Sequence, residues 1–360
     1  MPREKGKKFP GRNKEIRMKK EKGLKIEELG EFGFIAWFSP AFLQKLPRRV
    51  LGIGDDCAVI PWRGSKRLVV TTDMLVEDVH FLKEKISGED LGYKSLAVNL
   101  SDIAAMGAKP LYSFLSVAMP AKTKISWLAG FFRGWKKLSR QTRVFLLGGD
   151  TTGSREKIII SVTVLGIADE KNIRYRSGAR PGDVVAVTGN LGDSEGGLRL
   201  LLSGGEVGRF SPSEKFLIKR HLRPRAHLEE GQFLATRSEV RAMMDVSDGI
   251  DSDLRRIMEQ SACGAEVYVE KLPVSMALKN CCRKYQWPRD EIAAAGGEDY
   301  CLLVTIDPEK FPWLAENFSR RFHRPLTAIG KITPQKGRLV YLKDGCPYSL
   351  KKSGYDHFKK

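Results

Sequence analysis

The sequence predicts an α/β or α+β fold, because segments with the patterns of strands and helices alternate in both halves of the chain. Two short apolar runs, 68–72 and 158–167, have the composition of buried strands. In the stretch 91–110, apolar residues recur at three- and four-residue spacing, which is typical of a helix. With 360 residues, the chain is long enough for two domains of ordinary size.

The N-terminal half begins with a short predicted helix, followed by a glycine turn with two adjacent acids. Strands and helices then alternate. We predict helices at 28–38, 91–110 and 127–140, and strands at 68–72, 111–119, 144–147 and 158–167. In the helix 91–110, Asp90 can cap the first turn, and Gly107 followed by Pro110 can end the last one.

A passage rich in turn-forming residues, RSGARPGD at 176–183, is the predicted domain boundary. It separates an N-terminal domain, 25–175, from a C-terminal domain, 176–360, and a basic tail, 1–24, precedes both. The C-terminal strands are predicted at 184–188, 265–269 and 300–306 and near Ala328 and Leu339. One helix is entered by GNLGDSEGGL, one starts at Asp251 or Ser252 after MMDVSDG, and one starts at Glu309.

The net charge of +19 favours anionic partners, either nucleic acid or phosphorylated small molecules. Residues 1–24 hold ten Lys and Arg residues against three Glu, which is the composition of a disordered, solvated tail. No run of 18 apolar residues is present, so we predict no membrane span. Six scattered cysteines without C-x-x-C spacing are most simply reduced thiols, which predicts a cytoplasmic protein.

The helix 91–110 carries two stripes of different character. The apolar stripe predicts a buried face and consists of Leu96, Leu100 and Ile103. The polar stripe beside it consists of Ser95, Asn99 and Asp102. A buried acid needs a partner, and no Lys or Arg lies three or four residues from Asp102. The polar stripe is therefore either a solvated face or part of a site in which a partner from elsewhere, such as a bound cation, faces Asp102.

Acidic residues recur where predicted strands end or glycine turns begin. These acids are Asp55, Asp56, Asp73, Asp150, Asp245, Asp248, Glu298 and Asp299. One such acid alone is more often a helix cap or turn residue, but the recurrence favours a site for hard cations. Mg²⁺ prefers oxygen ligands and commonly shares substrate phosphates, and Thr71 and Thr72 add hydroxyl groups beside Asp73.

Several familiar catalytic motifs are missing from the sequence. It has no Walker A loop, no protein-kinase motif set, no G-x-S-x-G elbow and no H-x-x-x-H pair. If phosphates are bound, metal ions, backbone amides and an arginine must hold them. Arg176 and Arg180, near the predicted boundary, are either candidates for this role or residues of a surface turn.

Seven segments in this order resemble the thiamine-monophosphate kinases: GIGDDCAVI, LVVTTDMLVEDVHF, LGYKSLAVNLSDIAAMGAKP, GGDTT, RSGARPGD, DVSDGI and GGEDY. The resemblance extends from Glu28 to the final GYDHF. That family belongs to the aminoimidazole ribonucleotide synthetase superfamily. The resemblance implies a two-domain fold, with an N-terminal α/β domain whose sheet forms a homodimer and a C-terminal α/β domain that completes the active site.

The resemblance also implies an activity, the transfer of the ATP γ-phosphate to thiamine phosphate as the last step of thiamine diphosphate biosynthesis. We expect no protein nucleophile or base, because the attacking phosphate oxygen of thiamine phosphate is already anionic at neutral pH. The implied ligands of several Mg²⁺ ions are Asp55, Thr71, Thr72, Asp73, Asp102, Asp150, Asp245 and Asp248. The implied ATP contacts are Phe132, Gly149, Asp150, Arg176 and Ser247, and the implied thiamine phosphate contacts are His80, Glu298 and Tyr355. Phe132 and Tyr355 could instead be a helix core residue and a packed tail residue.

The chain departs from the family pattern at two positions near the implied site. Asp78 stands where the family usually has Gly, and Cys57 stands where Ala is usual, so metal geometry or affinity could differ. The basic extension before Gly23 has no family counterpart.

Related enzymes and other classes fit less well. Selenophosphate synthetase needs a reactive Cys or Sec in an N-terminal glycine-rich loop, and the hydrogenase-maturation relative ends in a catalytic Cys. Aminoimidazole ribonucleotide synthetase lacks this combination of motifs. A nucleic-acid-binding protein would use the net charge, but no recognition signature for that class is present. A non-catalytic nucleotide-binding relative would not need the full set of acids.

Overall fold

The computed structural model describes residues 25–44, 46–204, 210–351, 354–355 and 357–358. The predicted basic tail 1–24 lies outside them. The described residues fall into two compact units, one made of residues 25–44, 46–47 and 357–358 and the other of the described residues between 48 and 355. In the smaller unit, α1 (Ile26–Leu43) is longer than the predicted helix and has a kink at Gly30, whose φ is 69°.

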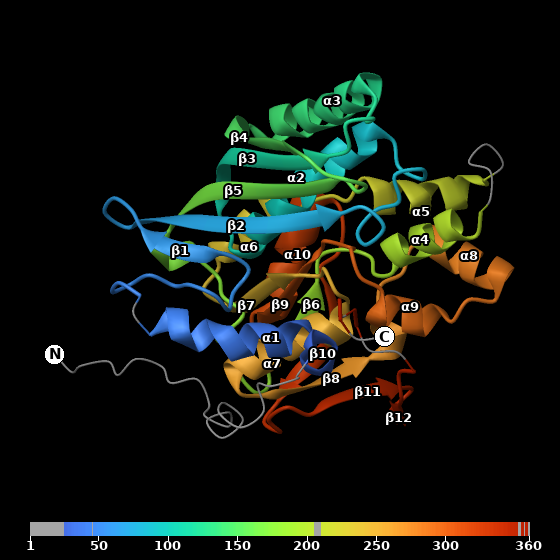
Figure 1. The fold of residues 1–360 in the computed structure, drawn as a ribbon. Helices are drawn as coiled ribbons and strands as arrows, with labels where there is room; N and C mark the ends of the chain where they lie inside the picture. The colour runs from blue at the N-terminus through green and yellow to red at the C-terminus, as the bar shows by residue number, and fades with distance from the viewer. Residues whose placement is uncertain (1–24, 45, 205–209, 352–353, 356, 359–360) are drawn as a thin grey trace. The chain divides into compact units, whose positions relative to one another are not determined.

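The larger unit contains a five-stranded sheet in the order β1-β2-β5-β3-β4 (Figure 1). Its strands are β1 (Ala58–Pro61), β2 (Lys66–Val76), β3 (Lys109–Met119), β4 (Phe145–Gly153) and β5 (Ile159–Asp169). The β3–β4 pair is parallel, and the other neighbours are antiparallel. β1 pairs only with residues 67–70 of β2, so the following residues of β2 lie beyond the end of β1.

The strand predicted at 144–147 extends further along the chain than we expected. Residues 148–152, the GGDTT segment, lie inside β4 and pair with β3. Gly149 makes this pairing possible, because a Cβ atom there would lie 1.7 Å from the carbonyl oxygen of Leu115.

Two helices cover the sheet, α2 (Gly88–Ala105) and α3 (Ile125–Thr142). They approach closely because both carry glycines, and a Cβ atom at Gly92 would lie 1.9 Å from the carbonyl oxygen of Phe131. α2 begins earlier than predicted. Ser87, not Asp90, is its N-cap and accepts a hydrogen bond from the backbone N–H of Asp90 at 3.0 Å. Gly107 follows the helix with φ of 67°, as its predicted role requires.

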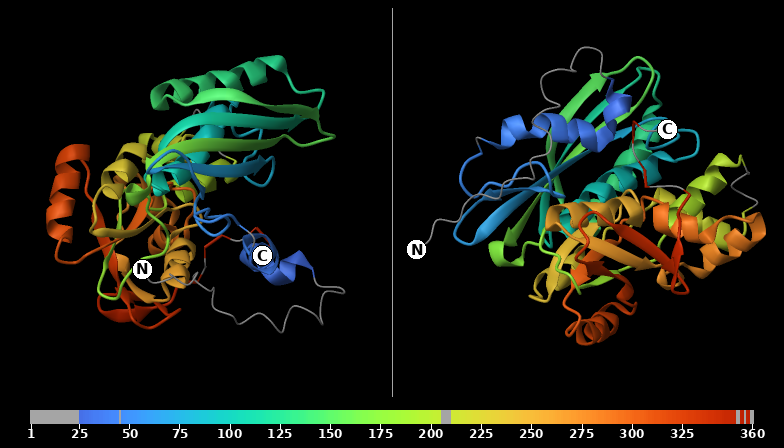
Figure 2. Two further views of the ribbon diagram at one scale, coloured as in Figure 1. Left: turned by 90° about the vertical axis from the view of Figure 1, so that its left-hand side faces the viewer. Right: turned by 90° about the horizontal axis from the view of Figure 1, so that it is seen from below.

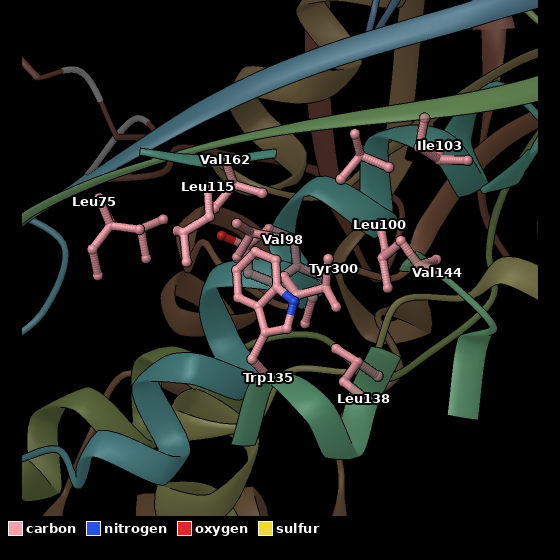
Figure 3. Close-up of a cluster of buried hydrophobic side chains, with 14 of the residues drawn as sticks. Leu75, Val98, Leu100, Ile103, Leu115, Trp135, Leu138, Val144, Val162 and Tyr300 are labelled. Atoms are coloured by element: carbon pink, nitrogen blue, oxygen red, sulfur yellow. The ribbon is translucent and has the colours of Figure 1, made fainter. Parts of the chain in front are cut away.

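The core beneath this sheet confirms the predicted apolar stripe of α2. Leu96, Leu100 and Ile103 are fully buried. Figure 3 shows Leu100 and Ile103 in one cluster with Trp135 of α3 and strand residues. Ser95 and Asn99 of the polar stripe are also fully buried, so the alternative of a solvated face is wrong for these two residues.

The second sheet has seven strands in the order β12-β11-β8-β10-β6-β9-β7, and only the β11–β8 pair is parallel. Its strands are β6 (Val184–Val187), β7 (Val240–Asp245), β8 (Gly264–Tyr268), β9 (Leu302–Ile306), β10 (Thr327–Thr333), β11 (Leu339–Lys343) and β12 (Cys346–Tyr348). The helices of this half are α4 (Asp193–Leu202), α5 (Pro212–Leu222), α6 (Leu228–Ala235), α7 (Ile250–Ser261), α8 (Met276–Tyr285), α9 (Arg289–Ala295) and α10 (Phe311–Phe322). We did not predict α5, α6, α8 and α9.

Helices pack on both faces of this second sheet (Figure 2). α7 contributes to the core on one face, whereas α6 and α10 contribute to the core on the other. Ala104 and Ala105, at the end of α2, belong to the latter core. α2 is therefore packed between the two sheets, which places its polar stripe where residues of both sheets can reach it.

Candidate active site

Three carboxylates from distant parts of the chain converge at α2. Asp56 precedes β1, Asp102 lies on α2, and Asp245 is the last residue of β7. Each offers an oxygen atom, and the three oxygens lie within 4.8 Å of one another. This acidic cluster, Asp56, Asp102 and Asp245, has the donor set that a hard cation prefers.

Hydroxyl and amide groups of β2 and α2 fix the geometry of the cluster. Thr71 donates a hydrogen bond from Oγ1 to Asp102 Oδ2 at 2.5 Å, and Ser101 donates from Oγ to Asp245 Oδ2 at 2.7 Å. The backbone N–H of Asp73 donates to Asn99 Oδ1 at 3.1 Å. The polar stripe of α2 therefore holds β2 at the cluster, and Ser101 of the same helix holds β7.

Burial and mutual repulsion raise the pKa values of the acids here. Burial, then Asp73 and Asp245, raises the pKa of Asp102 well above its usual value. Burial and the charge of Asp56 raise the pKa of Asp245 to about 7 and that of Asp73 to about 6. Because like charges disfavour the ionised form, these groups need either protons or cations to share the site.

Arg176 is a basic residue that contacts the cluster through Asp56. Arg176 Nη2 lies 2.8 Å from Asp56 Oδ1, and the backbone N–H of Arg176 lies 3.3 Å from the carboxylate oxygens of Asp55. Within the described residues, the buried Oδ2 atom of Asp56 has no hydrogen-bond partner. Burial and then Asp56 raise the pKa of Asp55 to about 7.

Asp56 was missing from the ligand set that the resemblance implied, which named only its neighbour Asp55. The sequence signal for Asp56 was the pair of adjacent acids in the glycine turn. Adjacent side chains point in different directions, and here Asp56 faces the cluster while Asp55 faces the backbone of Arg176. Arg176 was implied as an ATP contact, and the structure places it against Asp56.

Asp150 lies apart from the acidic cluster within one chain. The register runs from Asp73 on β2 across Val162 and Leu115 to Gly149 on β4, next to Asp150. Three strand spacings separate the ends of this row, which is about 14 Å. Every residue of β4 is exposed, and Asp150 Oδ1 accepts a hydrogen bond from the backbone N–H of Thr151 at 2.9 Å.

The GGED turn before β9 carries a second polar group, centred on Glu298. Its backbone N–H donates to the carbonyl oxygen of Ser247 at 2.7 Å, which brings it beside the loop after Asp245. Its carboxylate contacts Lys94 Nζ at 2.9 Å and His221 Nδ1 at 3.1 Å. Burial alone would raise the pKa of Glu298, but Lys94 and His221 hold it well below its usual value.

The neighbouring acid, Asp299, has a structural role. Its carboxylate accepts hydrogen bonds from the backbone N–H groups of Gly192, at 2.5 Å, and Ser194, at 3.2 Å, at the start of α4. This is the helix-capping alternative that we considered for single acids.

The loop after β2 holds the implied substrate residue His80. The backbone N–H of Val76 donates to His80 Nδ1 at 3.0 Å. Asp78, which replaces the usual Gly, adopts φ of 69° and forms an exposed ion pair with Lys157. Asp is one of the residues that tolerate this region, so the loop keeps its conformation without the glycine. Cys57 is buried, and burial raises the pKa of its thiol.

Three further implied residues lie on β2, on α3 and near the end of the chain. Thr72 is exposed and donates from Oγ1 to the carbonyl oxygen of Val162 at 3.1 Å. The backbone N–H of Tyr355 donates to the carbonyl oxygen of Asp248 at 3.2 Å, so the chain end returns to the DVSDG loop. Phe132 on α3 is 48% exposed, which contradicts the alternative of a helix core residue.

Comparisons with known proteins define the class first. The family model for the N-terminal domain of AIR synthase related proteins matches residues 54–168, and the model for their C-terminal domain matches residues 180–342. These matches and the two sheets confirm the predicted two-domain α/β fold. The boundary at residue 176 stays a prediction. None of the described helices combines the length and apolar character that crossing a membrane would require.

Individual relatives narrow the class. Thiamine-monophosphate kinase of Buchnera aphidicola subsp. Schizaphis graminum is 37% identical over 337 residues, covering 92% of this chain and 99% of the relative. The enzyme of the same name from Escherichia coli (strain K12) is 38% identical, with 91% and 98% covered. The solved structure of AaThiL complexed with AMPPCP and TMP is 36% identical with a TM-score of 0.81, and 93% and 99% of the two chains are covered. The chain belongs to the thiamine-monophosphate kinase family.

Proposed function

We propose that this protein transfers the γ-phosphate of ATP to thiamine phosphate and releases thiamine diphosphate and ADP. The observation that carries the proposal is the acidic cluster of Asp56, Asp102 and Asp245, to which both halves of the chain contribute. The relatives described above are thiamine-monophosphate kinases. The solved relative with AMPPCP and TMP supports ATP as the co-substrate. The six cysteines are free and five are buried, which suits the reducing cytoplasm that we expect.

We propose that Mg²⁺ ions occupy the acidic cluster. Two observations support the fit, the raised pKa values of Asp102 and Asp245 and the buried Asp56 Oδ2 atom that lacks a hydrogen-bond partner in the described part of the chain. When bound, Mg²⁺ supplies positive charge that offsets the charge of the phosphates. The proposed ligands are Asp56 together with the implied set, Asp55, Thr71, Thr72, Asp73, Asp102, Asp150, Asp245 and Asp248.

The proposed nucleotide contacts are those of the resemblance, with one change for Arg176. Since Arg176 holds Asp56, we propose that it orients this carboxylate and meets the ATP phosphates at the same place. Phe132, Gly149, Asp150 and Ser247 complete the proposed ATP contacts. His80, Glu298 and Tyr355 are the proposed contacts for thiamine phosphate.

We propose direct in-line transfer without a phosphorylated protein intermediate. The nucleophile is a phosphate oxygen of thiamine phosphate, and a phosphate monoester loses its second proton near pH ~6. At neutral pH a protein base would have no proton to remove. The residues of this chain then bind and orient two anions, which accounts for the concentration of carboxylates, hydroxyls and Arg176 at the site.

We also propose a homodimer in which β4 of the partner subunit lies beside β2. β4 is a fully exposed edge strand with large apolar residues, Phe145 at 63% and Leu147 at 57% exposure. β1 leaves residues 71–76 of β2 uncovered on the opposite edge of the sheet. Pairing these two edges would close the sheets into a barrel and remove both exposed edges. It would also bring a second Asp150 next to Asp73, which the separation of about 14 Å within one chain does not allow.

The activity is tested with purified protein, thiamine phosphate, ATP and Mg²⁺, and the products are separated by thin-layer chromatography. We expect thiamine diphosphate and ADP in equal amounts, and we expect none with EDTA. Folded protein that forms no thiamine diphosphate would refute the proposal. Light scattering should give twice the chain mass of 40.4 kDa, and a monomer at micromolar concentration would refute the dimer.

A further inference from the structure

α2 carries a lysine that is almost completely removed from solvent. The side chain of Lys94 is 1% exposed, and it is one of the largest fully buried side chains in the described residues. Lysine is almost never fully buried unless it is paired. Its Nζ atom lies 2.9 Å from Glu298 Oε1 and 3.0 Å from Oε2, so both carboxylate oxygens meet the same ammonium group.

A third residue completes the arrangement. His221 on α5 is also buried, and its Nδ1 atom lies 3.1 Å from Glu298 Oε2 and 3.0 Å from Ser194 Oγ. The side chain of Glu298 is 28% exposed, whereas those of Lys94 and His221 are 1% and 7% exposed. Glu298 is therefore the residue of this network that a ligand can reach.

The network is joined to the acidic cluster through α2 and the GGED turn. Lys94 and Asp102 are eight residues apart, so they lie on one side of the helix and about 12 Å apart along its axis. After the turn, the backbone N–H of Tyr300 donates to the carbonyl oxygen of Val246 at 2.8 Å, directly after Asp245. One helix thus sets the positions of both the metal-binding acids and Glu298.

We propose that Lys94 is a positioning residue that holds the Glu298 carboxylate as the anionic contact for the cationic thiazolium ring of thiamine phosphate. This inference rests on the proposed function and adds a residue that the resemblance did not name. Lys94 does not touch the substrate. It acts through Glu298, with His221 as the second donor, and it fixes where the cationic end of the substrate binds while the phosphate end meets the acidic cluster.

The test compares Lys94→Met with wild type in steady-state kinetics at saturating Mg²⁺. We expect the KM for thiamine phosphate to rise at least tenfold, while the KM for ATP stays within twofold. Lys94→Arg should restore most of the affinity, because it keeps the positive charge. Lys279→Met, at an exposed position of α8, is the matched control and should leave both KM values unchanged.

A double-variant cycle separates positioning from general stabilisation. Since Lys94 acts through Glu298, adding Lys94→Met to Glu298→Gln should change the KM for thiamine phosphate by less than twofold. An unchanged KM for thiamine phosphate in folded Lys94→Met, or an equal rise in both KM values, would overturn the inference. Wild-type protein that makes no thiamine diphosphate would instead overturn the proposed function.

Wild-type protein gives a second measurement if Lys94→Met does not fold. The chain has five histidines, so His221→Gln can assign the ring resonances of His221 in a histidine-labelled NMR sample. Saturating thiamine phosphate should shift these resonances, and the ATP analogue AMPPCP should shift them much less. No shift with thiamine phosphate would overturn the inference.

Discussion

Replacing Asp245 by asparagine should change stability and activity in opposite directions. Asn keeps the shape of the side chain, and its Oδ1 atom can still accept the hydrogen bond from Ser101. It loses the charge that repels Asp56 and that a cation would need. We therefore expect Asp245→Asn to stabilise the metal-free protein and to lower kcat by several orders of magnitude.

The size of the stabilisation follows from the pKa of Asp245. Burial and Asp56 raise this pKa from 3.8 to about 7, so the folded protein binds a proton that the unfolded chain has released. At about 1.4 kcal/mol per pKa unit, the free energy of unfolding at pH 7 is lower by about 4 kcal/mol than it would be without the shift. Between the unfolded and folded pKa values, stability falls as pH rises. Near pH 5 the same cost is only about 2 kcal/mol.

Urea unfolding in EDTA at pH 5 and pH 7 measures this difference directly. The stability gain of Asp245→Asn over wild type should be larger at pH 7. Added Mg²⁺ should stabilise wild type more than the variant, because a ligand of the folded state shifts unfolding by mass action. A variant that is less stable than wild type at pH 7 without metal, or that retains wild-type turnover, would refute the reasoning.

Other substitutions test separate parts of the site. Asp102→Asn and Asp150→Asn should each lower kcat by several orders of magnitude without unfolding the protein, and near-normal turnover of Asp102→Asn at saturating Mg²⁺ would contradict the cluster. A chain that starts at Met18 should keep kcat/KM within about twofold; a larger loss that fades with added salt would mean that the tail steers the anionic substrates. Asp78→Gly should leave the Mg²⁺ dependence of kcat unchanged, because the loop already has a glycine-like φ of 69°. His80→Asn should raise mainly KM, whereas stable label on the protein from γ-labelled ATP, or loss of a pKa from its kcat profile, would overturn direct transfer without a base.

Local pattern was enough to predict α2 and its two stripes. Helical spacing alone placed Leu96, Leu100 and Ile103 in the core, since periodicity is a property of neighbouring residues. The cost of burying Asp102 suggested a partner from elsewhere, and the structure places Thr71, Asp56 and Asp245 there. The short helices α5, α6, α8 and α9, with seven to eleven residues, offer too few turns for the same reasoning.

Contacts between distant residues were beyond such reasoning. Arg176 meets Asp56 across 120 positions, and Lys94 meets Glu298 across 204. Neither pair has a spacing rule, because each forms only when the tertiary fold brings distant segments of the chain together. The available signal for Lys94 was a lysine about two turns before Asp102 on the same predicted helix, and that signal names no partner.

A sequence motif also does not show whether the acids of one metal site come from one subunit or from two. Asp73 and Asp150 were expected in one metal site, yet they lie on opposite sides of the sheet order, with β5 and β3 between their strands. The parallel pairing of β3 with β4, which Gly149 permits, fixes Asp150 on an exposed edge. If both acids bind the same ions, the partner subunit must supply one of them. Mixing Asp73→Asn with Asp150→Asn then becomes decisive, because mixed dimers would contain one site with both substitutions and one site with neither. Recovery of up to about a quarter of wild-type activity, from random exchange of subunits, is expected only for a shared site. Two inactive variants that stay inactive after exchange would place both acids in the site of a single chain.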